Sequence, residues 1–202
     1  MDLKTLLCEK VVGFDPEKCF GLVIAAKSVK HEADNVYGFC LSDNKGNLRY
    51  VSLFGEGVPD STMAYDRVNS FQIMPTVSFV EAYAKLLNLL PKDAVVFSAY
   101  AARWATVIFK DIPVKFPAAP IREDLKHVDI VNFCKAIDAG FIPDGDLVEF
   151  SIQHGGGKRI SLDTLGSMNA IPRDLSVTGP EERAIIIGKL IDKYFGKELK
   201  EG

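Results

Sequence analysis

One apolar segment constrains the fold of this chain more than any other. FGLVIAA, residues 20–26, is a continuous apolar run, which is typical of a strand buried on both faces of a sheet. NVYGFCLSD (35–43) and LRYVSLF (48–54) are also predicted strands. The turn NKGN (44–47) joins them, and Gly46 permits a positive φ angle there. The chain is therefore expected to open with an antiparallel meander of three strands.

The segments after the meander predict helices and further short strands. Ser78 and Glu81 form a capping-box pattern ahead of an apolar stripe, so 78–90 is a predicted helix, and AVVFS (94–98) is a predicted buried strand. We also expect helices at 99–109, 123–138, 161–171 (capped by Ser161) and from Gly179 onward. Residues 146–153 are a predicted strand, and a hairpin turn at 155–157 is expected to let residues 158–161 pair back with it. This order predicts an α/β fold of three layers, with a mixed sheet between helices.

Length, charge and cysteine usage limit the classes of function. The chain has 202 residues, with 24 Lys and Arg against 27 Asp and Glu, which excludes binding of nucleic acid by bulk positive charge but not by a local basic groove. No apolar run approaches the ~20 residues of a membrane helix, and the N-terminus lacks the apolar segment of a secretory signal. The cysteines lack metal-binding spacing: Cys8, Cys19, Cys40 and Cys134. We therefore expect a cytoplasmic protein with no membrane association, no zinc and no cofactor.

Four segments in order resemble one enzyme family. They are GLVIAAKS (21–28), FVEAYAKLLNLLPKDAVVFSAYAARWA (79–105), KHVDIVNFCKAID (126–138), and ISLDTLGSMNAI with PEERAIIIGKLIDKYF (within 160–195). Together they resemble the DnaQ-like, or DEDD, 3′–5′ exonucleases. The resemblance implies a ribonuclease-H-like fold over 20–196, preceded by an extension at 1–19 and followed by a polar tail at 197–202. In that family, four carboxylates hold two divalent metal ions for phosphodiester cleavage, and a His or Tyr acts as general base.

The positions that match the family's metal-binding acids hold no acid here. The two acids of the family's first strand fall on Ala25 and Lys27, and the Asp of its second motif falls on Arg103. The last Asp falls on Ile187, and the family's His, five residues before it, falls on Glu182. No Asp or Glu occurs at 20–29 or at 94–110, so a shift of register restores none of them. The resemblance therefore implies a degenerate exonuclease with no catalytic or metal-binding residue in the matched positions.

Three functions remain open. The first is an inactive exonuclease-like protein that binds DNA, RNA or a nucleic-acid-processing partner, and its candidate binding residues are Lys27, Arg103, His154, Lys158 and Arg159. The alternative for these residues is an ordinary solvated or ion-paired surface. The second function is a protein-interaction or scaffold module, with a protein partner or a second copy of the chain. The third is a divergent metal-dependent exonuclease with relocated carboxylates, drawn from Asp111, Asp124, Asp129, Asp138, Asp144, Asp146 and Asp163.

Overall fold

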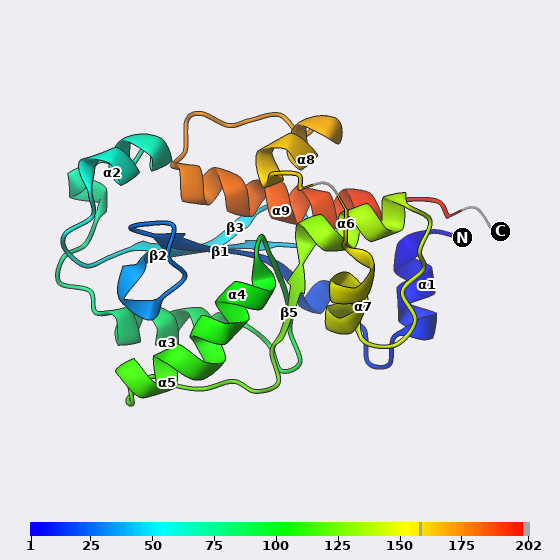
Figure 1. Cartoon of the computed structure of the whole chain (residues 1–202), viewed down its shortest axis with the longest axis horizontal. Helices are drawn as coiled ribbons and strands as arrows, with labels where there is room; N and C mark the ends of the chain where they lie inside the picture. Colours follow the sequence, from blue (N-terminus) through cyan, green and yellow to red (C-terminus); the bar gives the residue numbers. More distant parts are fainter. Residues whose placement is uncertain (158, 200–202) are drawn as a thin grey trace.

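A five-stranded sheet with the strand order β3-β2-β1-β4-β5 organises the fold (Figure 1). The computed structural model describes residues 1–157 and 159–199. The strands are β1 (Cys19–Ala26), β2 (Val36–Asp43), β3 (Leu48–Leu53), β4 (Val95–Ser98) and β5 (Lys126–Asp129). β2 is antiparallel to β1 and β3, whereas β4 is parallel to β1 and β5. The expected meander and mixed sheet are confirmed.

Helices cover both faces of this sheet. They are α1 (Leu3–Lys10), α2 (Asp60–Asp66), α3 (Phe79–Leu89), α4 (Ala101–Thr106), α5 (Ile112–Lys115), α6 (Ile130–Asp138), α7 (Leu147–His154), α8 (Leu162–Met168) and α9 (Gly179–Phe195). Short 3-10 turns lie at η1 (Pro16–Lys18), η2 (Ala33–Asn35) and η3 (Ser70–Gln72), and the π-helical η4 (Val107–Asp111) joins α4 to α5. In Figure 1, α8 and α9 lie above the sheet and α3, α4 and α5 below it. The central strands therefore have buried residues on both sides, which explains the continuous apolar run of β1.

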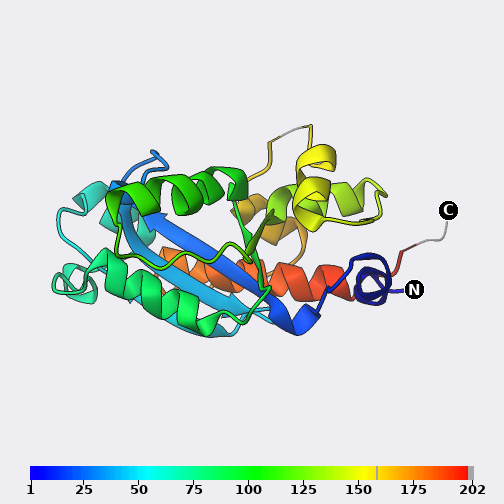
Figure 2. The ribbon, with the colours of Figure 1, turned by 90° about the horizontal axis from the view of Figure 1, so that it is seen from below.

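The long helix α9 packs very closely against β1 and β2, and Figure 2 shows it running along the sheet. A Cβ on Gly188 would lie 2.4 Å from the carbonyl O of Asp43, and a Cβ on Gly21 would lie 2.9 Å from Ile187 Cγ2. The Ser42 hydroxyl donates to the carbonyl O of Ala184 at 2.6 Å across this interface. Backbone atoms meet at Gly188, whereas at Gly21 a Cβ would overlap the side chains of Ser42 and Ile187, so neither position has room for a larger residue.

The expected helix over 123–138 is wrong in its first part. Residues 126–129 form β5, and α6 begins only at Ile130. β5 pairs in parallel with all four residues of β4. Asp129 then caps α6, because its carboxylate accepts a hydrogen bond from the backbone N–H of Asn132 at 3.0 Å. A strand this short depends on its neighbour in the sheet, which local periodicity does not reveal.

The expected strand at 146–153 is also wrong, because the segment forms α7. The Asp146 carboxylate accepts from the backbone N–H groups of Val148 and Glu149, which is an N-cap. Leu147 and Phe150 are buried at helical spacing. The hairpin expected at 155–157 is therefore absent: no strand precedes it, and residues 159–161 form none. Lys158 lies outside the described residues.

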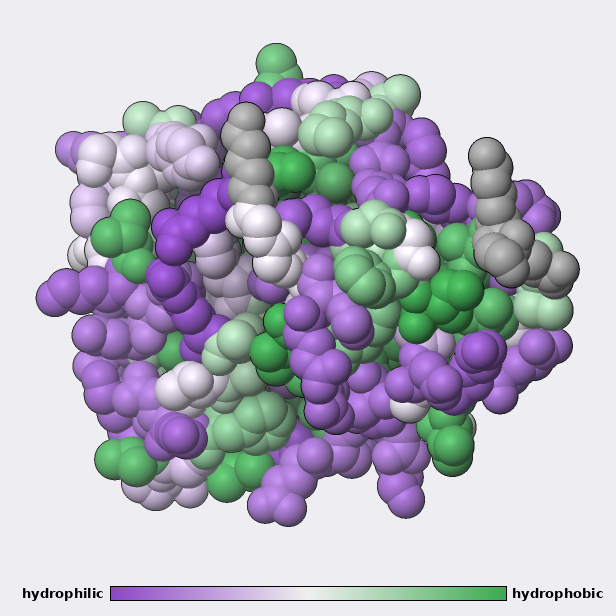
Figure 3. All heavy atoms as spheres, turned by 45° about the vertical axis from the view of Figure 1, so that its right-hand side comes forward, coloured by the Kyte–Doolittle hydropathy of each residue, from purple (hydrophilic) through white to green (hydrophobic). Residues whose placement is uncertain are grey.

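The N-terminal residues form part of the core. Leu3 and Leu7 of α1 are fully buried in the cluster that α9 covers, and the backbone N–H of Leu3 donates to the carbonyl O of Lys197 at 3.0 Å. The space-filling view of the side that carries α1, α6 and α7 shows small hydrophobic patches separated by hydrophilic side chains (Figure 3). None of the described helices has the length and apolarity that a membrane span requires.

We expect Leu7→Ala to lower the free energy of unfolding by about 2–5 kcal/mol, because it leaves a cavity under α9. Val12→Ala is the matched control: Val12 is 93% exposed, and the change should stay within about 0.5 kcal/mol. Urea denaturation followed by circular dichroism measures both. Equal stability of the two variants would instead support a domain that starts near residue 20, with residues 1–19 as a separate extension.

Candidate functional site

A groove opens where the parallel strands β1 and β4 end, the place where open α/β sheets commonly bind ligands. It consists of two hollows. The one that reaches the buried residues of β1 has a volume of about 390 Å³ and is called the deep hollow. The one between α4, α6 and the segment before α8 has a volume of about 650 Å³ and is called the outer hollow. The two hollows are continuous, since both are lined by Ser28, Val29, His31, Tyr65, Ala99, Tyr100, Leu162 and Arg183.

Two of the positions matched to metal ligands lie in the deep hollow, and both are apolar. Ala25, near the end of β1, is 2% exposed, and Ile187 on α9 is 0% exposed. Ala25 packs with Tyr37 and Leu53, whereas Ile187 belongs to the core beneath α9. The structure thus brings these two matched positions together, and neither offers an oxygen ligand.

The basic candidates are divided between the groove and other surfaces. Arg103 and Arg159 are exposed and line the outer hollow, and the Arg103 guanidinium lies 5.9 Å from the centre of the Tyr100 ring. Lys27 does not line the groove, because its Nζ donates to the carbonyl O of Glu56 at 2.7 Å. His154 stacks on Phe141 with ring centroids 4.4 Å apart, in a separate hollow between α6, α7 and α8.

Glu182 is a buried structural anion rather than a group that faces the groove. Its carboxylate accepts hydrogen bonds from Arg67 at 2.8 Å, from Arg173 at 2.9 Å and from the backbone N–H of Asp174 at 3.0 Å. The Arg173 guanidinium, and next that of Arg67, lower the pKa of the Glu182 carboxyl from 4.5 to about 2, against the opposing effect of burial. Glu182 therefore ties the start of α9 to α2 and to the loop before α9.

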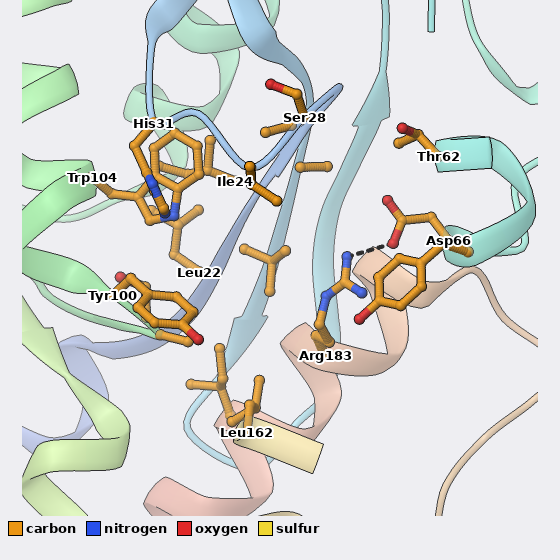
Figure 4. A pocket seen from close by; sticks show the side chains of 18 of the residues that line it. Leu22, Ile24, Ser28, His31, Thr62, Asp66, Tyr100, Trp104, Leu162 and Arg183 are labelled. Carbon is orange, nitrogen blue, oxygen red and sulfur yellow. Dashed lines mark hydrogen bonds and ion pairs between the residues drawn. The ribbon is translucent and has the colours of Figure 1, made fainter. Parts of the chain in front are cut away.

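Arg183 is a groove residue that the sequence analysis missed (Figure 4). Its Nη2 lies 2.7 Å from Oδ1 of Asp66, and the Tyr37 hydroxyl donates to Oδ2 of the same carboxylate. Burial, followed by the bond to Asp66, raises the pKa of Tyr37, so its hydroxyl stays protonated. Arg183 precedes Ile187 by four residues, which places both side chains on the same face of a helix, so this spacing is the signal by which the sequence could have indicated Arg183. No signal pointed to Asp66, because only the folded chain brings α2 to α9.

An aromatic wall faces Arg183 across the deep hollow (Figure 4). The His31 ring lies 4.7 Å from that of Trp104 and 5.8 Å from that of Tyr100, centroid to centroid. Burial, with a smaller contribution from Arg103, lowers the pKa of His31 and favours its neutral form. Asp129 holds the start of α4 beside this wall, because its carboxylate accepts from the backbone N–H of Ala101 at 3.2 Å.

The carboxylates of the groove do not fit a two-metal centre. Asp66 lines the deep hollow, whereas Asp129 and Asp163 line the outer one. Asp66 is engaged by Arg183, and Asp129 by two backbone N–H groups. Within residues 1–157 and 159–199, no three His, Cys, Asp or Glu side chains are placed to hold a metal ion together. Each ion of a two-metal site needs several oxygen ligands, which these residues do not assemble.

Other acids considered for a relocated metal centre have structural partners. Asp111 accepts from the backbone N–H of Ala33 at 2.6 Å, and Asp146 caps α7. Asp124 pairs with Arg122 at 2.6 Å, and Asp138 pairs with Lys197 at 2.5 Å. These contacts lie in different parts of the fold and supply no shared site.

Comparison with solved structures finds the same fold in exonuclease I. The complex of exonuclease I with the inhibitor BCBP superposes with a TM-score of 0.57 at 13% sequence identity. The complex of E. coli exonuclease I with a dA16 oligonucleotide superposes with a TM-score of 0.55, also at 13% identity. The ExoI/SSB-Ct complex gives 0.55 at 12%. In each of these three comparisons the matched region covers 87% of this chain and 41% of the exonuclease I chain, so this chain spans about two-fifths of the length of exonuclease I. No family model and no curated protein matches the sequence. The expected exonuclease-type, ribonuclease-H-like fold is confirmed.

The buried Glu182 carboxylate should make stability depend on pH. Its pKa is about 2 in the folded protein and 4.5 when unperturbed, so its contribution is complete above pH 4.5 and is lost as the pH falls toward 2. We expect Glu182→Gln to remove about 3 kcal/mol of this pH-dependent stability, which is the free energy that corresponds to the difference between the two pKa values. Urea denaturation at pH 5.5, 4 and 3 measures it. The difference between wild type and variant should shrink as the pH falls; a constant difference would contradict the assignment.

Proposed function

We propose that this protein binds single-stranded nucleic acid in the groove and does not cleave it. The observation that carries the proposal is the composition of the groove, which combines arginines and aromatic rings with apolar residues where the exonuclease resemblance places metal ligands. Single-strand binding sites commonly combine a basic track along the backbone with aromatic rings that stack on bases.

The charges of the outer hollow support a phosphate backbone as ligand. Arg103, Lys135, Arg159 and Arg183 line it, against Asp129 and Asp163. Lys135 donates to the carbonyl O of Gly155 at 2.8 Å, and Arg183 is paired with Asp66. Arg103 and Arg159 are therefore the exposed cations best placed to contact phosphates. A net formal charge of −3 for the whole chain is compatible with this local basic track.

The apolar floor of the deep hollow supports the absence of cleavage. Metal-assisted phosphodiester hydrolysis needs carboxylates that hold the ions and bring the attacking water in line. Ala25 and Ile187 stand where the resemblance implies two of those carboxylates. Among solved structures of the same fold, one is a complex with a dA16 oligonucleotide and another is the ExoI/SSB-Ct complex, so a protein partner is the alternative ligand.

We expect Arg103→Ala and Arg159→Ala each to weaken binding of a fluorescent single strand, whereas Lys27→Ala leaves it unchanged. Each lost phosphate contact should reduce the slope of log affinity against log salt by about 0.7. Fluorescence anisotropy at several salt concentrations measures both quantities. Lys27→Ala is the matched control because it also removes one positive charge, outside the groove. Equal loss in all three variants would indicate a general charge effect and contradict a groove-specific contact.

We expect labelled single-stranded DNA and RNA to stay full length in Mg²⁺ or Mn²⁺, and binding to be the same in EDTA. Denaturing gels and anisotropy measure these outcomes. Shortening of the strands that requires Mn²⁺ and co-purifies with the protein would instead support a divergent enzyme with relocated carboxylates. Binding of a protein partner without any binding of nucleic acid would support the interaction module.

A further inference from the structure

The deep hollow has two chemically different walls (Figure 4). His31, Tyr100 and Trp104 form an aromatic wall on the side of α4, and Arg183 presents a guanidinium on the side of α9. A planar apolar surface opposite a cation suits a ligand that has a flat ring at one end and an anion at the other.

Arg183 is prepared to receive an anion. Its side chain is 24% exposed, and the carboxylate that orients it, Asp66, is 3% exposed and also bound by Tyr37. A guanidinium has five N–H donors, and in the part of the chain that the structure describes Asp66 is its one hydrogen-bond acceptor. The remaining donors face a hollow rather than a protein acceptor.

Ser98 supplies an independent indication that the hollow is a binding site. It is 2% exposed at the end of β4 and lines the same hollow. Its Oγ has no hydrogen-bond partner among residues 1–157 and 159–199. A buried hydroxyl without a partner is costly, and an oxygen of a ligand in the hollow offers the partner that the protein lacks.

Tyr100 is the exposed and strained member of the aromatic wall, whereas Trp104 is buried. Tyr100 has a φ angle of 60° just before α4, which is unfavourable for a residue other than glycine, and its side chain stays 59% exposed. The His31 ring contacts both Tyr100 and Trp104 edge-on. Strain of this kind is characteristic of binding sites, where it places a side chain for a ligand.

We infer that the deep hollow binds a nucleotide with a terminal phosphate, which Arg183 holds while the base lies against Tyr100 and His31. The volume of about 390 Å³ falls in the range of small-molecule sites. The phosphate belongs either to the end of a nucleic-acid strand or to a free nucleotide, and the chemistry recognised is the same. For a strand end, the inference rests on the proposed function; for a free nucleotide, it stands independently of it.

Five ligands separate these cases. Three are one oligonucleotide with a 5′-phosphate, with a 3′-phosphate and with neither, and the other two are adenosine 5′-monophosphate and adenosine. We expect the phosphorylated member of at least one matched pair to bind about tenfold more tightly, as a charge-assisted hydrogen bond provides. Isothermal titration calorimetry measures the free nucleotides, and anisotropy competition measures the strands. Oligonucleotides that bind without any preference for a terminal phosphate, together with adenosine monophosphate that binds no better than adenosine, overturn the inference and leave the proposed function intact. Nucleotide binding without strand binding overturns the proposed function and leaves the inference intact.

Variants test which side chains of the protein bind the phosphate. Arg183→Gln should abolish the preference for phosphate, and Arg183→Lys should retain part of it, because lysine keeps the charge but not the fork. Ser98→Ala removes a hydroxyl that has no partner among the residues that the structure describes, so folding should be unaffected while phosphate affinity falls several-fold. Arg103→Ala should weaken all strands equally. If Arg183→Gln leaves Asp66 unpaired and fails to fold, Arg183→Lys and Ser98→Ala decide the question. A preference for phosphate that is unchanged in both contradicts the inference.

Discussion

The contact between α9 and the sheet determines where the residues of the groove lie. Backbone atoms meet at Gly188, where a Cβ would lie 2.4 Å from the carbonyl O of Asp43, and Gly21 leaves room for Ile187. The Ser42 hydroxyl joins the two layers at 2.6 Å from the carbonyl O of Ala184. Because α9 cannot move away from β1 without losing this packing, the side chains of one helix face are held at the end of the sheet.

Two consecutive residues at the start of α9 hold α2 beside the groove, and one of them, Arg183, lines it. Glu182 points away from it and binds Arg67 and Arg173, whereas Arg183 points into it and binds Asp66. The pairs Glu182–Arg67 and Arg183–Asp66 reach α2 or the residue that follows it, so α2 is held against α9 by charges of opposite sign. These buried pairs fix the position of the groove. They are weaker evidence of net stability, because the desolvation of the charged groups offsets much of their attraction.

Parts of the fold were accessible to sequence patterns because their signals are local. The apolar run at β1, the turn at Gly46 and the cap at Ser161 were all predicted correctly. The sequence does not reveal β5, because a four-residue strand forms only beside β4. The segment of α7 resembles a strand in sequence, because its apolar residues alternate, although Asp146 caps it as a helix. Of the candidate site residues, Ala25, Ile187, Arg103 and Arg159 share the groove, whereas Lys27, Glu182 and His154 lie elsewhere.

The sequence by itself determined the opening meander, the helix α3 and strand β4 that follow it, and the absence of acids at the positions matched to metal ligands. These features depend on single residues and short periodicities. Only the tertiary structure decided that Arg183, Asp66 and Tyr37 form one chain of contacts facing an aromatic wall. Those residues come from β2, α2 and α9, up to 146 positions apart (37 to 183). Their meeting depends on how helices pack across a sheet, which no local pattern encodes.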